Sequence, residues 1–80
     1  MTTDEDRAFL SEVGVAVTQD RASWPTFSAP HCFAAAVEFI GEVGKPFSVV
    51  GRPVDRARVR KACVKLVAVL VRLAVEEEPP

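Results

Sequence analysis

Hydrophobic residues recur at spacings of three and four along three separate stretches of the chain, which is typical of amphipathic helices. In the first stretch, Phe9, Leu10, Val13 and Val17 follow an acidic start. Acidic side chains favour this position because the N-terminal end of a helix carries partial positive charge. We therefore predict a first helix at about residues 4–20.

The second stretch is bounded by residues that begin and end helices. Ser28 is a suitable N-cap, and Pro30 falls in the first turn, where its missing N–H leaves no hydrogen bond unmade. Gly44 followed by Pro46 indicates the helix end. These signals predict a second helix at about residues 29–43.

The third stretch is the longest and the most apolar. Its helical repeat comprises Cys63, Leu66, Val67, Leu70, Leu73 and Ala74. The valines between residues 67 and 71 also suit a strand, but the length of the segment and its lack of internal Gly or Pro favour a helix. We predict a third helix at about residues 54–77, and hence an all-α fold with one domain over residues 1–80.

The third helix is apolar around more of its circumference than one short chain is expected to cover. Val64, Val69 and Val71 lie off the stripe that the leucines form. Burying them against a second copy would gain about 25 cal/mol per Å². A homodimer is the simplest closed arrangement, so we expect a homodimer or a higher homo-oligomer.

Composition indicates a folded chain, with 49% hydrophobic and 26% charged residues. The two cysteines show no metal-binding or redox spacing, so we expect reduced thiols.

The N-terminus is acidic, unlike a signal peptide, and the longest apolar run is too short to span a bilayer. We expect a soluble, cytoplasmic protein with no membrane partner.

Charge is distributed unevenly although the net charge is only −1. Basic residues gather before and within the start of the third helix: Arg52, Arg56, Arg58, Arg60, Lys61 and Lys65. Such a segment suits phosphate groups, and a nucleic-acid-binding helical dimer is one interpretation of it. The pI of 5.7 and the acidic chain ends oppose that interpretation, and we expect no nucleic-acid partner.

Two glutamates in the second helix are candidates for metal binding. Glu38 and Glu42 are four residues apart, so their carboxylates share one helix face and repel each other unless a cation lies between them. Mg²⁺ prefers such oxygen ligands. The pair is either half of a metal site for phosphate chemistry or part of a solvated, salt-bridged face.

The segments WPTFSAPHCFAAAVEFIGEV and RVRKACVKLVAVLVRL resemble the MazG-like, all-α nucleoside triphosphate pyrophosphohydrolases. The likeness covers roughly residues 5–75. It rests on the Trp-Pro-x-Phe motif, the glutamate block and the basic start of a Val/Ala-rich helix. The resemblance implies an intertwined helical oligomer in which acids on two helices hold Mg²⁺. That ion positions a nucleoside triphosphate for hydrolysis to the monophosphate and pyrophosphate.

The chain departs from this family at the metal-binding positions. The family's Glu-Glu-x-x-Glu block falls on Glu38, Phe39 and Glu42, and its Glu-x-x-Asp pair falls on Ala62 and Lys65. Three of the five acids are therefore absent. Because the hydrolysis depends on the metal, the resemblance implies an inactive relative without a cofactor. In it the Lys65 ammonium supplies positive charge beside the two glutamates.

We accordingly expect a catalytically inactive protein that binds a nucleotide or serves as an oligomeric interaction module. The candidate nucleotide- or phosphate-binding residues are Trp24, His31, Arg56, Arg60 and Lys61. Trp24 has ordinary packing as its alternative role, and His31 has local hydrogen bonding. The alternative function is an active, Mg²⁺-dependent pyrophosphohydrolase whose missing acids come from a partner subunit, from Asp55 or from residues 76–78.

Overall fold

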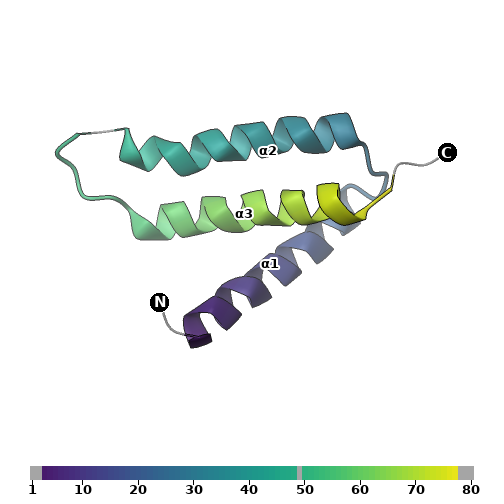
Figure 1. The fold of residues 1–80 in the computed structure, drawn as a ribbon, viewed down its shortest axis with the longest axis horizontal. Helices are drawn as coiled ribbons and strands as arrows, with labels where there is room; N and C mark the ends of the chain where they lie inside the picture. The colour runs from purple at the N-terminus through teal and green to yellow at the C-terminus, as the bar shows by residue number, and fades with distance from the viewer. Residues whose placement is uncertain (1–2, 49, 78–80) are drawn as a thin grey trace.

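The computed structural model, which describes residues 3–48 and 50–77, confirms the all-α prediction. Three α-helices and one short 3₁₀ helix follow in the order α1 (Thr3–Ser23), α2 (Ala29–Gly44), η1 (Lys45–Phe47) and α3 (Arg56–Val75). The described residues contain no strand. Figure 1 shows α2 and α3 lying antiparallel, with α1 crossing α3 obliquely. None of the described helices is both long and apolar enough to cross a membrane.

The helix ends follow from local chemistry. Ser28 occupies the N-cap of α2 with extended backbone, although its side chain makes no capping hydrogen bond. The start of α3 was predicted two residues too early. The Asp55 carboxylate accepts a hydrogen bond of 3.2 Å from the backbone N–H of Arg58, so Asp55 is the N-cap and the helix begins at Arg56.

The core is small and lies where α1 crosses α3. Val13 and Val17 of α1 pack on Ala68 of α3, and the partly buried residues around them are Phe9, Ala16, Val64, Val67 and Val71. Val69 is buried as well, at 6% exposure. The prediction that Val64, Val69 and Val71 need a second copy to cover them was therefore wrong. The chain covers these residues itself, because α1 packs on Val64 and Val71 and Val69 is buried beside α2 and the α1–α2 connection.

The α2–α3 pair forms the other part of the fold. Ala36 of α2 and Ala62 of α3 are both buried, and such small side chains suit a close approach of two helices. The molecule is elongated and thin, with extents of 50 × 28 × 18 Å. Its radius of gyration of 14.2 Å exceeds the value of about 11.6 Å for a compact chain of this length. Much of α2 therefore has no helix packed against it on its outer side.

Candidate functional site

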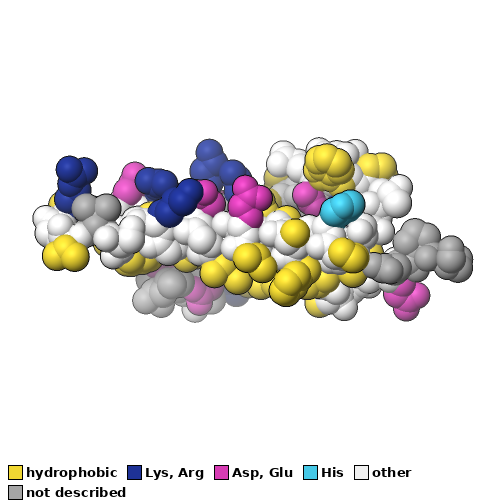
Figure 2. Space-filling model, turned by 90° about the horizontal axis from the view of Figure 1, so that it is seen from above, with side chains coloured by type: hydrophobic (Ala, Val, Ile, Leu, Met, Phe, Trp, Pro, Cys, Tyr) yellow, Lys and Arg dark blue, Asp and Glu magenta, His cyan; other side chains and the backbone are white. Residues whose placement is uncertain are grey.

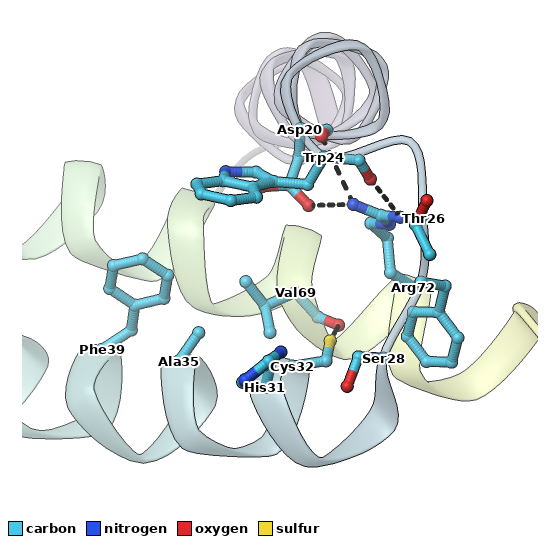
Figure 3. Close-up of a pocket in the computed structure, with 11 residues that line it drawn as sticks. Asp20, Trp24, Thr26, Ser28, His31, Cys32, Ala35, Phe39, Val69 and Arg72 are labelled. Atoms are coloured by element: carbon cyan, nitrogen blue, oxygen red, sulfur yellow. Dashed lines mark hydrogen bonds and ion pairs between the residues drawn. The ribbon is translucent and has the colours of Figure 1, made fainter. Parts of the chain in front are cut away.

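A cavity of about 460 Å³ opens where the α1–α2 connection meets α2 and α3 (Figure 3). Its size falls within the range of small-molecule sites. We call it the connection pocket. It is lined by Asp20 of α1, by Trp24, Thr26, Phe27 and Ser28 of the connection, by His31, Cys32, Ala35 and Phe39 of α2, and by Val69 and Arg72 of α3.

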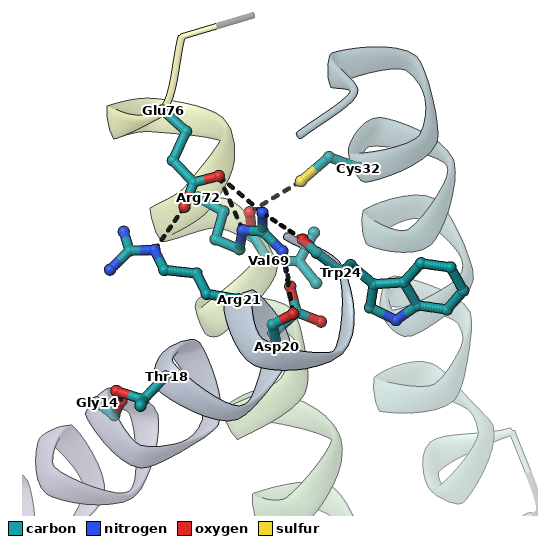
Figure 4. Close-up of polar contacts among 9 residues, drawn as sticks. All are labelled: Gly14, Thr18, Asp20, Arg21, Trp24, Cys32, Val69, Arg72 and Glu76. Carbon is teal, nitrogen blue, oxygen red and sulfur yellow. Dashed lines mark hydrogen bonds and ion pairs between the residues drawn. The ribbon is translucent and has the colours of Figure 1, made fainter. Parts of the chain in front are cut away.

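Arg72 holds the three segments of the connection pocket together (Figure 4). Its guanidinium donates hydrogen bonds to Asp20 Oδ2 at 2.7 Å, to the Trp24 carbonyl oxygen at 3.0 Å and to Glu76 Oε2 at 2.8 Å. The hydrogen bonds from Glu76 and Asp20 raise the pKa of Arg72 further above its usual range. Because Arg72 is only 4% exposed and two carboxylates neutralise it, its charge is used within the chain.

Arg72 and Glu76 also contact residues of α1 and of the connection. Arg21 donates a hydrogen bond to the second Glu76 oxygen, and the Phe27 ring lies 5.8 Å from the Arg72 guanidinium carbon. Hydrogen bonds from Arg72 and then Arg21 lower the pKa of Glu76, so its carboxylate stays ionised. The end of α3 is thereby tied to the end of α1 and to the connection.

Cys32 lies at the floor of the pocket as a neutral thiol. Burial raises the pKa of this thiol, which the nearby Arg72 charge only partly offsets. Its Sγ donates a hydrogen bond of 3.3 Å to the Val69 carbonyl oxygen, and both Cys32 and Cys63 are free. A thiol with a raised pKa is a poor nucleophile, so the role of Cys32 is to join α2 to α3.

The structure brings two of the predicted ligand-binding residues together. The Trp24 indole extends from the connection toward Phe39, and the His31 ring lies on α2 beside Cys32 (Figure 3). Trp24 is 70% exposed, so little of its indole surface is spent on packing. Phe39 of α2 contributes a second aromatic surface. The pocket thus has aromatic walls from two separate segments.

The predicted glutamate face follows the pocket along α2. Lys45 donates a hydrogen bond of 2.7 Å to Glu42 Oε1, and this bond is the main reason that the pKa of Glu42 is lowered. The charges of Arg58 and Lys65 on α3 lower that pKa further. Lys65 therefore acts on Glu42 through space, while Lys45 is the direct partner. Glu38 is exposed on the same helix.

These side chains do not fit a Mg²⁺ site. Glu42 is paired with a lysine, Phe39 and the buried Ala62 offer no oxygen ligands, and Lys65 repels a cation. Over residues 3–48 and 50–77, no three His, Cys, Asp or Glu side chains gather closely enough to hold a metal ion. We therefore derive no metal-dependent step for this face.

The basic candidates lie elsewhere on α3. Arg60 pairs with Glu12 at 3.2 Å, and its guanidinium carbon lies 5.6 Å from the centre of the Phe9 ring, so it faces α1. Arg56 and Lys61 are both exposed. Lys61 precedes Arg72 by eleven residues, which is about 16 Å along a helix axis. None of these three residues lines the connection pocket.

Sequence reasoning missed the roles of Asp20 and Arg72 in the site. Arg72 stands within an apolar stripe four residues before Glu76, a spacing that indicates an ion pair along the helix. Nothing comparable marks Asp20, because its partner lies 52 residues further along the chain.

Comparison with known proteins assigns neither a family nor a function to the chain. No protein-family model, curated protein or solved structure matches the chain. Membership of the MazG-like family stays a prediction, and the site is interpreted from its own geometry.

The two lysines near Glu42 should differ in their effect on its titration. We expect Lys45→Met to raise the pKa of Glu42 toward its ordinary value, and Lys65→Met to raise it by less, because Lys45 is the hydrogen-bonded partner. The Glu42–Lys45 pair contributes stability above the ordinary glutamate pKa and loses it as pH falls through the lowered value. Side-chain carboxyl NMR measures both shifts.

Lys61→Met provides the control for this titration, since Lys61 is not among the groups that shift the Glu42 pKa. An unchanged Glu42 pKa in Lys65→Met would contradict the placement of Lys65 beside this face.

Proposed function

We propose that this protein binds a nucleotide in the connection pocket without a metal ion and does not hydrolyse it. The observation that carries the proposal is the meeting of Trp24, His31 and Phe39 around one cavity. Aromatic rings stack on every base, with a contribution of about 1–3 kcal/mol for each base. Because the walls come from two segments, a planar ring can enter between them.

Polar groups around the pocket suit the edge of a base. Thr26, Ser28 and His31 supply acceptors and donors at its rim and walls, beside the Asp20 carboxylate that accepts from Arg72. Arg72 is not counted among them, because its hydrogen bonds are directed at Asp20, Trp24 and Glu76. The pocket is therefore better suited to the base than to the phosphates.

Phosphate groups would extend along the face that carries Lys65. Arg58 and Lys65 provide positive charge there, as their effect on the Glu42 pKa indicates. Fixed ammonium and guanidinium groups neutralise phosphate charge without a metal. In the MazG-like family that the sequence resembles, acids that hold Mg²⁺ stand at the positions of Phe39, Ala62 and Lys65.

The alternative of an active, Mg²⁺-dependent enzyme needs acids from elsewhere. Asp55 caps α3 through the Arg58 N–H, and Glu76 is held by Arg72 and Arg21. Both carboxylates thus have structural roles, and Glu78 lies outside the described residues. These contacts favour binding over catalysis.

One basic residue that a nucleic-acid-binding dimer would need is already paired within the chain. Arg60 is engaged by Glu12 and Phe9 on α1. Binding to nucleic acid would fall steeply with added salt and would not discriminate among free nucleotides.

Trp24 makes the proposal directly measurable, since it is the only tryptophan of the chain. We expect saturable quenching of its fluorescence by nucleoside mono- or triphosphates, unchanged by EDTA or by Mg²⁺. Phe39→Ala should weaken binding about tenfold through the lost stacking surface. Phe47→Ala removes an exposed phenylalanine outside the pocket and should leave binding unchanged.

Two results would contradict the proposal. Binding that requires Mg²⁺ would favour the active enzyme, and pyrophosphate release would then be assayed with the same nucleotides. Unchanged Trp24 fluorescence at millimolar nucleotide, with the folded state verified by circular dichroism, would exclude the pocket as a nucleotide site.

A further inference from the structure

The outer side of the α2–α3 pair carries a continuous apolar surface. Phe33, Val37, Ile40 and Leu70 are 62%, 53%, 57% and 44% exposed, respectively. We call these four residues the apolar face. Figure 2 shows hydrophobic side chains along one edge of α2, with charged side chains and the single histidine along the opposite edge.

Helix geometry places the apolar face opposite the connection pocket. Residues two positions apart on a helix are rotated by about 200° from each other. Phe33 and Val37 each lie two positions from Ala35, which lines the pocket, and Leu70 lies two positions from Arg72. The Cys32–Val69 hydrogen bond places the two helices in register, so Phe33 and Leu70 flank the same helix contact.

The apolar face carries no charge that would oppose burial. The neighbouring positions beside these residues are uncharged, namely Ala34, Gly41 and Gly44 in α2 and Cys63 and Ala74 in α3, and the one basic residue on this side of α3 is Arg56 in its first turn. An uncharged face is complementary to itself, which is what a two-fold contact between identical chains requires.

The total surface area of the chain is large enough to allow a further contact. The chain exposes 6006 Å², whereas a compact monomer of 8.7 kDa exposes about 4,700 Å². The excess of about 1,300 Å² exceeds the roughly 800 Å² that each partner contributes to a standard interface. The chain therefore has enough exposed surface to supply one side of a dimer interface.

We propose that a second copy of this chain covers the apolar face, forming a two-fold dimer across Phe33, Val37, Ile40 and Leu70. This surface differs from the valine stripe on which the sequence-based expectation of a dimer rested. Because the apolar face lies opposite the pocket, both connection pockets of the dimer stay open to ligand. The dimer therefore does not depend on the proposed nucleotide binding.

Sedimentation equilibrium of the full chain over a concentration series tests this dimer. We expect twice the chain mass, and a melting temperature that rises with protein concentration, as linkage to association requires. Ile40→Glu should weaken self-association by at least about tenfold, because it buries a charge without a partner. Val15→Glu introduces the same change at a residue of α1 with matched exposure (56% against 57%) and should leave the dimer intact.

Each outcome is decisive. A wild-type chain that stays monomeric at millimolar concentration, with a melting temperature independent of concentration, overturns the proposal. So does a dimer that Val15→Glu dissociates and Ile40→Glu does not. If Ile40→Glu unfolds while Val15→Glu remains folded, the proposal is supported, because glutamate is a good helix former and an uncovered residue would tolerate it.

Discussion

Arg72→Met is expected to lower the free energy of unfolding by about 3 kcal/mol, the low end of the range for removing one partner of a buried ion pair. Methionine can replace the apolar part of the arginine side chain but cannot donate to Asp20 or to the Trp24 carbonyl. The low end applies because the molecule is only 18 Å thick, so nearby water can partly solvate the carboxylate that Arg72 leaves unpaired. Urea denaturation followed by circular dichroism measures the change.

The consequence for so small a chain is severe. Domains of this size commonly have only a few kcal/mol of stability, so a large share of Arg72→Met should be unfolded in buffer. Arg21→Met is the matched control. It removes the exposed partner of Glu76, and we expect a loss below about 1 kcal/mol. Equal losses in the two variants would show that burial of Arg72 adds nothing.

Ala68→Leu is expected to destabilise the fold by about 2 kcal/mol, as overpacking of a core position does. Ala68 is 3% exposed and forms the surface on which Val13 and Val17 of α1 rest. A leucine there pushes α1 away from α3, because Val13 and Val17 already pack against this position. Hydrogen exchange should accelerate more in α1 than in α2.

Ala57→Leu makes the same substitution at an exposed position in the first turn of α3. Its stability should change by less than about 0.5 kcal/mol, as is usual for surface substitutions. If Ala68→Leu accelerates exchange uniformly along the chain, α1 and the α2–α3 pair unfold together rather than separately.

Helix periodicity was sufficient to predict the three helices but not the side of α3 that α1 covers. The spacing of apolar residues identifies a stripe that will be buried, without saying which element buries it. Val64 and Val71 were therefore assigned to a second copy, whereas α1 packs on them. The start of α3 was misplaced because Pro53 and Asp55 both suit a helix start, and only the capping hydrogen bond distinguishes them.

Only the part of the candidate site that depends on residue type was predictable from the sequence. Residue type identified Trp24 and His31, which both line the pocket. Asp20 and Arg72 are 52 residues apart in sequence and meet only in the folded chain, so no local sequence pattern predicts their contact. The glutamate face was predictable from the four-residue spacing, but the direct partner of Glu42 is Lys45 on its own helix end rather than Lys65.

The position of Arg72 in the sequence affects how the protein is made. Asp20 and Trp24 leave the ribosome well before Arg72, their hydrogen-bond donor, so α1 and the connection stay unanchored until the last helix has been synthesised. Contacts between residues so distant in sequence also form late, because closing the intervening loop reduces chain entropy. The connection pocket should therefore be the last part of the molecule to form, and a chain truncated before Arg72 should fail to form it.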